Sequence, residues 1–155
     1  MKLIAHRGNI DGPNTLKENH PDYIDDAISK GFDVEVDIRL IDHKFYLGHD
    51  EPQYHVPMTW LVKRKDNLWV HCKDLNSLSN LISIPVDFNC FWHQTDDFTL
   101  TTKNYIWTYP GKTCTPKSVI VMPEWNSETK FEDLKTLSCF GVCSDHVSKI
   151  KIIDK

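Results

Sequence analysis

VEVDIRLIDHKFYLGHD, residues 34–50, is the stretch that decides the fold. Its first part, residues 34–40, is a short and largely apolar run of the kind that forms a strand buried on both faces. A second apolar run, residues 45–47, follows after a short polar link. That link is too short for a helical crossover, so we expect the second run to return as a hairpin extension of the first strand.

Short apolar runs of this type recur along the whole chain. The others span residues 3–5, 68–70, 88–92, 105–107, 119–122 and 140–143, and a last run at 150–153 alternates with lysine and could be an edge or closing strand. Residues 21–30, 74–82 and 128–137 instead place apolar side chains at helical spacing. Strands that alternate with helices favour the α/β class with a parallel sheet.

The length of the chain limits the architecture. A complete (β/α)8 barrel uses about 200 residues or more, whereas this chain has 155. The links from Trp92 to Tyr105 and from Trp107 to Val119 are short and rich in Thr, Pro and Gly, so they cannot hold full helices. We therefore expect a single domain, residues 1–155, built as a trimmed or distorted TIM (β/α) barrel with reduced helices in its second half. An incomplete barrel would leave an exposed sheet edge, which a homodimer could cover.

Composition and charge narrow the class of function. The net charge is −4, which argues against a nucleic-acid binder because such proteins normally show a basic face. The five cysteines lack paired Cys-x-x-Cys spacing, so we expect reduced packing residues. No segment reaches the roughly 20 apolar residues of a membrane span, and the first residues leave no room for a signal peptide. These features favour a cytoplasmic protein without an integral membrane segment.

Polar clusters follow the predicted strands of the first fifty residues. His6-Arg7-Gly8 follows the first strand, and His49-Asp50 follows the hairpin. Because barrel active sites form at the carboxyl ends of strands, we expect these side chains to meet at one rim. Imidazole suits proton transfer near neutral pH, and the Arg7 guanidinium can bind phosphate with a fork of donors. The alternatives are a capped strand end with a surface salt bridge for the first cluster and a simple turn for the second.

Two carboxylates, Glu35 and Asp37, lie two positions apart on the second predicted strand and therefore face the same side. Burying them is costly unless they are neutralised, and Mg²⁺ or Ca²⁺ would do this because both ions prefer oxygen ligands. A solvated surface strand is the alternative, since Asp33 and Arg39 share that side of the strand. The pair is a candidate metal site.

In this order, the clusters resemble the glycerophosphodiester phosphodiesterase family, within the phospholipase-C-like phosphodiesterase superfamily. The residues that carry the resemblance are His6-Arg7-Gly8, Gly12, Glu18-Asn19, Glu35-Val36-Asp37 and His49-Asp50. The resemblance implies that His6 and His49 are the catalytic acid–base pair. It also implies that Glu35 and Asp37 bind a divalent metal ion. Their oxygen ligands make Mg²⁺ or Ca²⁺ the expected ion, with Mn²⁺ as an alternative.

The resemblance is looser after residue 50. His71-Cys72-Lys73 stands where the family has Glu-x-Lys, so Lys73 corresponds to a phosphate-facing lysine and His71 to a metal-binding glutamate. Imidazole suits Mn²⁺ or Zn²⁺ better than Ca²⁺, and a hydrogen-bonded structural histidine is the alternative for His71. Trp107 and Asp145 correspond to residues near the ends of the family's later strands and are candidate pocket residues.

The combined prediction is a metal-dependent phosphodiester hydrolase that acts on small glycerophosphodiester-like substrates. One histidine would activate water or a neighbouring substrate hydroxyl, and the other would protonate the departing alkoxide. Two alternatives stay open. The first is a phosphodiesterase for lysophospholipids or other lipids on the same scaffold, and the second is a non-catalytic barrel that binds a phosphorylated ligand.

Overall fold

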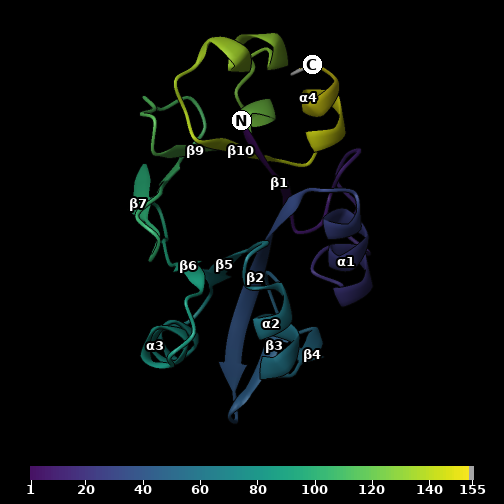
Figure 1. Cartoon of the computed structure of the whole chain (residues 1–155), viewed down its shortest axis with the longest axis vertical. Coiled ribbons are helices and arrows are strands. Elements are labelled where there is room, and N and C mark those ends of the chain that lie inside the picture. The colour runs from purple at the N-terminus through teal and green to yellow at the C-terminus, as the bar shows by residue number, and fades with distance from the viewer. Residues whose placement is uncertain (154–155) are drawn as a thin grey trace.

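One strongly curled sheet organises the chain in the computed structural model, which describes residues 1–153 (Figure 1). The strands are β1 (Lys2–His6), β2 (Asp33–Ile41), β3 (Lys44–Leu47), β4 (Tyr54–Val56), β5 (Leu68–Cys72), β6 (Asn89–Phe91), β7 (Phe98–Leu100), β8 (Ile106–Thr108), β9 (Ser118–Val121) and β10 (Gly141–Ser144). The helices are α1 (Pro21–Ser29), α2 (Met58–Arg64), α3 (Leu75–Ser83) and α4 (Val147–Ile153), with the 3-10 helices η1 (Pro123–Trp125) and η2 (Phe131–Thr136). Within this range no helix has the length and apolar character to span a bilayer.

Parallel pairing joins most of the sheet. The strand order around the curl is β6-β5-β2-β1-β10-β9-β8-β7, and in this series only β7 runs antiparallel to its neighbour. An antiparallel extension, β3 and β4, leaves the sheet from the last residues of β2. Because the parallel strands point the same way, their carboxyl ends meet at one rim.

The curl does not close into a complete barrel, since no ladder pairs β6 with β7 within residues 1–153. Instead, the backbone N–H of Thr102 donates to the carbonyl of Cys90 at 2.9 Å, and the Thr102 hydroxyl accepts from the N–H of Cys90 at 2.9 Å. The chain that follows β7 thus occupies hydrogen-bonding groups on the open side of β6. The homodimer expected from an exposed edge stays a prediction.

Strand β2 is buried on both of its sides. Its even-numbered residues pack in the large core beneath the helices; they are Val34, Val36 and Ile38. The first three odd-numbered residues face the inside of the curl; they are Asp33, Glu35 and Asp37, and each is at most 5% exposed. The solvated surface strand considered as the alternative for the Glu-x-Asp pair is therefore wrong.

An aromatic layer fills part of the inside of the curl beside the carboxylates, since Trp69 is opposite Glu35 and Phe91 is opposite His71 in the parallel register. Trp69, Phe91 and Trp107 are buried, with ring centroids 4.5 Å apart for Phe91 and Trp107 and 5.9 Å apart for Trp69 and Trp107. The Trp69 indole N–H donates to Asp33 at 3.1 Å. The Trp69 indole therefore provides a hydrogen-bond donor for the buried Asp33 carboxylate. Glu35 and Asp37 lie further along β2, nearer the carboxyl-terminal rim.

The α/β class and most predicted elements are confirmed. The hairpin extension is present, with Ile38 opposite Leu47 in the antiparallel register. The reduction of helices in the second half is also confirmed, since the described chain between β6 and β10 has only the two 3-10 helices. The sequence patterns did not predict β4, α2 or β7, which are short and weakly patterned.

Two predicted elements are wrong. The run at 150–153 is not a strand but part of α4, whose buried residues Val147 and Ile150 are three positions apart on one helical face. Alternation with lysine over four residues is too short to separate a strand from this spacing. The helix predicted at 128–137 is only η2, in which Leu134 is the one buried residue, and so small an apolar face does not stabilise an isolated amphipathic α-helix.

Candidate active site

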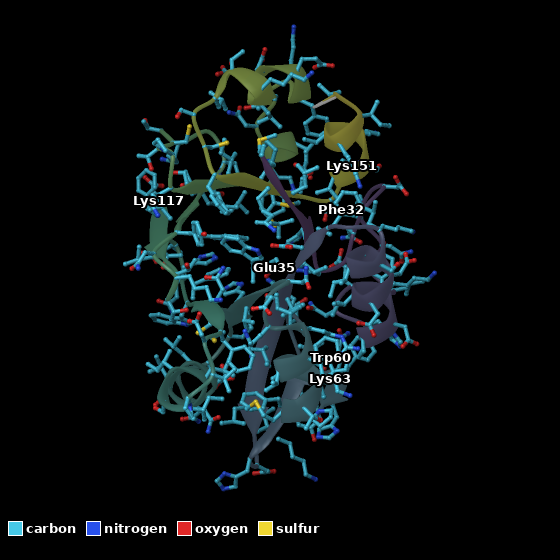
Figure 2. All side chains as sticks on the ribbon, viewed as in Figure 1. Phe32, Glu35, Trp60, Lys63, Lys117 and Lys151 are labelled. Atoms are coloured by element: carbon cyan, nitrogen blue, oxygen red, sulfur yellow. The ribbon has the colours of Figure 1, made fainter. Side chains whose placement is uncertain are left out.

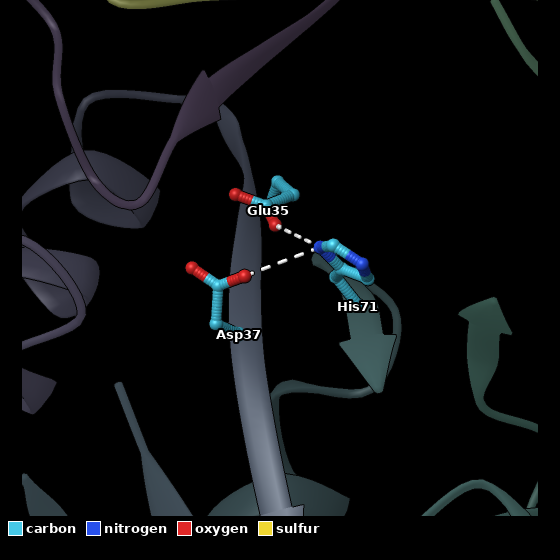
Figure 3. A group of neighbouring side chains, drawn as sticks. All are labelled: Glu35, Asp37 and His71. Carbon is cyan, nitrogen blue, oxygen red and sulfur yellow. Dashed lines mark ion pairs between the residues drawn. The ribbon is translucent and has the colours of Figure 1, made fainter. Parts of the chain in front are cut away.

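Two neighbouring strands bring three metal-ligand side chains together. Glu35 and Asp37 lie on β2, and His71 lies on β5 opposite Asp37 in the parallel register. The Nδ1 atom of His71 is 3.2 Å from Oδ1 of Asp37 and 3.7 Å from Oε1 of Glu35 (Figure 3). One ligand atom from each residue lies within 4.8 Å of the others. Because Ca²⁺ and Mg²⁺ hold their ligands at about 2.0–2.6 Å, one divalent cation fits between these atoms.

Asp37 is the more heavily partnered carboxylate. Arg7 Nε is 3.0 Å from its Oδ2, and Lys73 Nζ is 3.6 Å from its Oδ1. The Asn19 side chain donates to Oδ2 at 3.0 Å and accepts from the Asp37 backbone N–H at 2.9 Å. Burial works to raise the pKa of Asp37, but the nearby His71 ring and the Arg7 charge outweigh it and hold that pKa well below its usual range. Asp37 is therefore ionised at neutral pH.

The carboxylate of Glu35 has fewer and weaker partners than that of Asp37. Its Oε2 accepts from the backbone N–H of Arg7 at 3.3 Å, and His6 Nε2 is 4.0 Å away. Burial, together with the Asp37 carboxylate, raises the pKa of Glu35 to about 7. Figure 2 shows Glu35 among the side chains inside the curl, near the middle of the molecule. A buried carboxylate that resists ionisation marks a candidate functional site.

The donor set of this group suits a divalent cation. Asp37 Oδ1 is a buried oxygen that accepts no well-formed hydrogen bond among residues 1–153; its neighbours are the ion-pair partners His71 and Lys73. Burial lowers the pKa of His71 to about 4, so its ring is neutral at pH 7. Metals bind neutral imidazole and ionised carboxylate. A bound cation would also stabilise the ionised form of Glu35.

His6, at the end of β1, is held by a carboxylate on the other side of the site. Its Nδ1 is 2.8 Å from Oδ1 of Asp145, which directly follows β10. Asn9 donates to the same oxygen at 2.8 Å, and Glu124 accepts from the Asp145 backbone N–H at 2.8 Å. Burial works to lower the pKa of His6, but the Asp145 hydrogen bond and the Glu35 charge outweigh it and raise that pKa. These contacts fix the ring with its Nε2 toward Glu35.

The turn after β1 requires its glycine. Arg7 and Gly8 have φ values of 53° and 90°, and a Cβ on Gly8 would lie 2.8 Å from the Tyr23 ring. The turn sends Arg7 across the sheet toward β2. Its backbone N–H donates to the Glu35 carbonyl at 3.0 Å, and its Nη1 donates to Glu18 at 2.9 Å. Arg7 thereby connects the first strand to the carboxylates of β2.

His49 reaches the site from the loop between β3 and β4. Gly48 starts this loop with a φ of 146°, and a Cβ there would clash with the backbone carbonyl of Glu51. Arg39 Nη2 donates to the backbone carbonyls of His49 at 2.6 Å and Asp50 at 3.1 Å. The His49 ring pairs through Nδ1 with the Asp50 carboxylate at 2.7 Å. The backbone conformation of Gly48 and the hydrogen bonds from Arg39 of β2 therefore set the position of His49.

A cavity of about 220 Å³ connects these groups at the carboxyl-terminal rim. Its lining residues are His6, Arg7, Glu35, His49, His71, His93, Asp96, Thr99, Trp107, Tyr109, Pro110, Val121, Met122 and Trp125. The histidines and Glu35 thus share one space with an aromatic wall. Tyr109 and Trp125 in this wall are 51% and 63% exposed, which leaves aromatic surface available to a ligand.

The structure brings the predicted site residues together, some on the surface of the cavity and the others directly behind it. Those on the cavity surface are His6, Arg7, Glu35, His49, His71 and Trp107. Asp37 and Lys73 lie behind Glu35 and His71 in the ion-pair group. Asp145, predicted as a pocket residue, is outside the set that lines this cavity and instead holds Nδ1 of His6. Its contribution is to orient that ring.

Several supporting residues were not predicted. Asn9 and Arg39 were given no functional role, because their roles depend on contacts between distant segments; Asn9 and Asp145, for example, are 136 positions apart. His93 and Glu124 each follow a predicted strand run, at positions where polar groups either line the pocket or cap the sheet; His93 lines the cavity and Glu124 holds the Asp145 backbone. Asn19 stood within the Glu18-Asn19 part of the family resemblance, but that pattern assigned it no role. Its φ of 62° and its two bonds to Asp37 now give it one.

Compared with protein-family models, with curated proteins and with solved structures, the chain finds no match. The family resemblance therefore rests on the motifs quoted above.

Proposed function

We propose that this protein is a metal-dependent phosphodiester hydrolase acting on small glycerophosphodiester-like substrates, on a trimmed TIM (β/α) barrel. The observation that carries the proposal is that two histidines share one cavity with members of a buried Glu–Asp–His group. Acid–base groups and a divalent cation are the components that phosphodiester hydrolysis uses. The motifs that resemble the glycerophosphodiester phosphodiesterase family support the same reaction.

The buried group supplies charge compensation at the phosphate. A divalent cation held by Glu35, Asp37 and His71 would polarise the phosphoryl oxygens and offset their developing charge. Arg7 and Lys73 lie beside Asp37 and add positive potential where the phosphate would sit. These side chains make the local electrostatic potential favourable for an anionic substrate, although the net charge of the protein is −4.

The two histidines supply the proton transfers. One imidazole takes a proton from the attacking water or from a substrate hydroxyl, and the other gives a proton to the departing alkoxide. Asp145 occupies Nδ1 of His6, and Asp50 occupies Nδ1 of His49. Each ring therefore keeps Nε2 for the reaction.

The size of the cavity favours small substrates. Its volume of about 220 Å³ is below the roughly 300–1,000 Å³ of pockets for drug-sized ligands. A glycerol phosphate ester of a compact alcohol is closer to this scale than a diacyl lipid. A lysophospholipid is the second candidate, because the exposed Tyr109 and Trp125 rings could contact an acyl chain outside the cavity.

Hydrolysis by the purified protein tests the proposal. The substrates are a chromogenic phosphodiester, a panel of glycerophosphodiesters and a lysophospholipid, each with Mg²⁺, Mn²⁺, Ca²⁺ or EDTA. We expect cation-dependent release of an alcohol and a phosphomonoester, abolished by EDTA. Faster turnover of the lysophospholipid would support the second candidate. Cation binding without turnover of any substrate would contradict an enzyme and indicate a barrel that binds a phosphorylated ligand.

Arg39→Ala is expected to lower kcat by about tenfold or more while leaving cation affinity unchanged. The side chain holds the backbone of His49 and Asp50 but makes no ion pair with the carboxylates of β2, so its loss should misplace His49 alone. Steady-state kinetics and calorimetric cation titration measure the two effects. Arg64→Ala removes an equal charge from α2, away from the cavity, and serves as the control. Equal loss of kcat in both variants would contradict this positioning role.

Cation affinity is expected to rise with pH up to about 7 and then to level. The pKa of Glu35 is raised to about 7, so a proton competes with the cation below that pH, whereas Asp37 is already ionised. With one competing proton, the apparent affinity should be about tenfold higher at pH 8 than at pH 6. Calorimetric titration in buffers of different ionisation enthalpy also counts the released proton. The same titration of Glu35→Gln should lack this pH dependence.

A further inference from the structure

We propose that His71 makes the buried cation site select a divalent transition-metal ion such as Mn²⁺ or Zn²⁺ over Mg²⁺ and Ca²⁺. The inference rests on the proposed function, since it concerns the cation of the same site. It departs from the expectation, drawn from the two carboxylates alone, that Mg²⁺ or Ca²⁺ is preferred.

The position of the ring nitrogen is the first support. His71 Nδ1 points between the two carboxylates, 3.2 Å from Asp37 Oδ1 and 3.7 Å from Glu35 Oε1 (Figure 3). The parallel register of β2 and β5 sets this placement, because it aligns the Cα atoms of Asp37 and His71. A cation that contacts both carboxylates there meets the nitrogen as its third protein ligand.

The second support is that the ring is held in place by stacking. The His71 ring is nearly parallel to the ring of His93, at 4.5 Å between centroids and 7° between planes, and to the ring of Phe91, at 5.1 Å and 9°. A ring packed on two others cannot swing away without losing both contacts. The lone pair of an imidazole nitrogen lies in the ring plane, so His93, stacked in a parallel plane, cannot bind the same ion. His93 is therefore a positioning residue for His71.

The chemistry of the donors leads to the choice of metal. Ca²⁺ and Mg²⁺ prefer sites made of oxygen atoms. Imidazole nitrogen suits Zn²⁺ and related transition-metal ions, and Mn²⁺ is the transition-metal ion that also suits carboxylates. Two buried carboxylates with one fixed nitrogen form a mixed donor set. Arg7 and Lys73 already neutralise part of the Asp37 charge, which reduces the electrostatic attraction of the site for any cation. The bond to the imidazole nitrogen therefore contributes a larger share of the binding free energy.

The test is cation binding by the intact protein, with Mn²⁺, Mg²⁺ and Ca²⁺ each titrated alone by calorimetry. We expect at least about tenfold tighter binding of Mn²⁺ than of either other ion. His71→Phe keeps a ring for stacking on Phe91 and His93 but removes the nitrogen, and it should abolish this preference. His71→Glu should reverse it in favour of Mg²⁺ or Ca²⁺. His55→Asn, which removes an exposed imidazole from β4, is the control and should bind like the wild type.

A spectroscopic measurement on the wild type needs no variant to fold. Electron spin-echo modulation of the Mn²⁺-loaded protein should contain the nitrogen signal of a directly bound imidazole, and His55→Asn should retain it. A bound Mn²⁺ without this signal, equal affinity for Mn²⁺ and Mg²⁺, or no binding of any of the three ions would overturn the inference. Hydrolysis supported equally by all ions would overturn it while leaving the proposed function intact. Selective Mn²⁺ binding without hydrolysis would support it and contradict the proposed enzyme.

Discussion

Replacing His6 by alanine is expected to lower kcat for phosphodiester hydrolysis by about 10²–10⁴-fold. The ring lines the cavity, its Nε2 faces Glu35 at 4.0 Å, and Asp145 holds its other nitrogen. The other histidine of the proposed acid–base pair, His49, enters the cavity from a separate loop and does not occupy that position. Steady-state kinetics at saturating cation measure the loss. A kcat within a few-fold of the wild-type value, in a folded protein, would contradict the assignment of His6 as a catalytic residue.

Two variants separate this chemical loss from a structural one. His55→Ala removes an exposed imidazole outside the cavity and should leave kcat unchanged. Asp145→Asn should retain part of the activity but move the pH dependence, because the Asp145 hydrogen bond contributes to the raised pKa of His6. With that contribution weakened, the limb of the pH–rate profile that reports His6 should move to lower pH. An unchanged profile would mean that Asp145 does not act through His6.

Replacing Asp37 by alanine is expected to lower the free energy of unfolding by about 3–5 kcal/mol. The carboxylate is fully buried and is the partner of Arg7, Asn19 and Lys73. Its removal would leave the Asn19 amide and the Arg7 Nε group in the interior without their acceptor. Arg7 would keep its ion pair with Glu18 but lose the one with Asp37. Urea unfolding in the presence of EDTA measures the effect without a contribution from bound cation.

Glu35→Gln is the matched variant, because it changes the other carboxylate of the Glu35–Asp37–His71 group, with an expected effect on stability of opposite sign at pH 8. The pKa of Glu35 is about 7, above its ordinary value of 4.5, so the folded state binds a proton more tightly than the unfolded state. In the cation-free wild type this contribution to stability is present below pH 4.5 and is lost as pH rises through 7, an effect of about 3 kcal/mol at most.

The glutamine variant should therefore be more stable than the wild type at pH 8 and should lose the fall in stability between pH 5 and pH 8 that Glu35 causes. Cation binding should nevertheless be weakened in it, as in Asp37→Ala. Comparable destabilisation of the two variants at pH 8 would show that the carboxylates are equally well compensated. The different roles assigned to Glu35 and Asp37 would then be wrong.

The local sequence was sufficient to predict the helices and strands whose own residues carry a clear apolar pattern. The strand with Glu35 and Asp37 and its hairpin return were predicted from an apolar run and a short polar link. The alternation of strands and helices predicted the α/β class. The last element was not predictable, because four residues of lysine alternation at the end of the chain suit a strand as well as one face of α4. Packing of Val147 and Ile150 against the sheet decided between them.

The sequence by itself determined which residue types could perform chemistry and on which side of their strands they lie, because side-chain parity along a strand is a local property. Only the tertiary structure decided which of them meet. The parallel register of β2 and β5 aligned His71 with Asp37, and the parallel pairing of β1 with β10 placed Asp145 against His6 from 139 positions away. Such pairings depend on which strands become neighbours, and burial of the whole chain selects those neighbours.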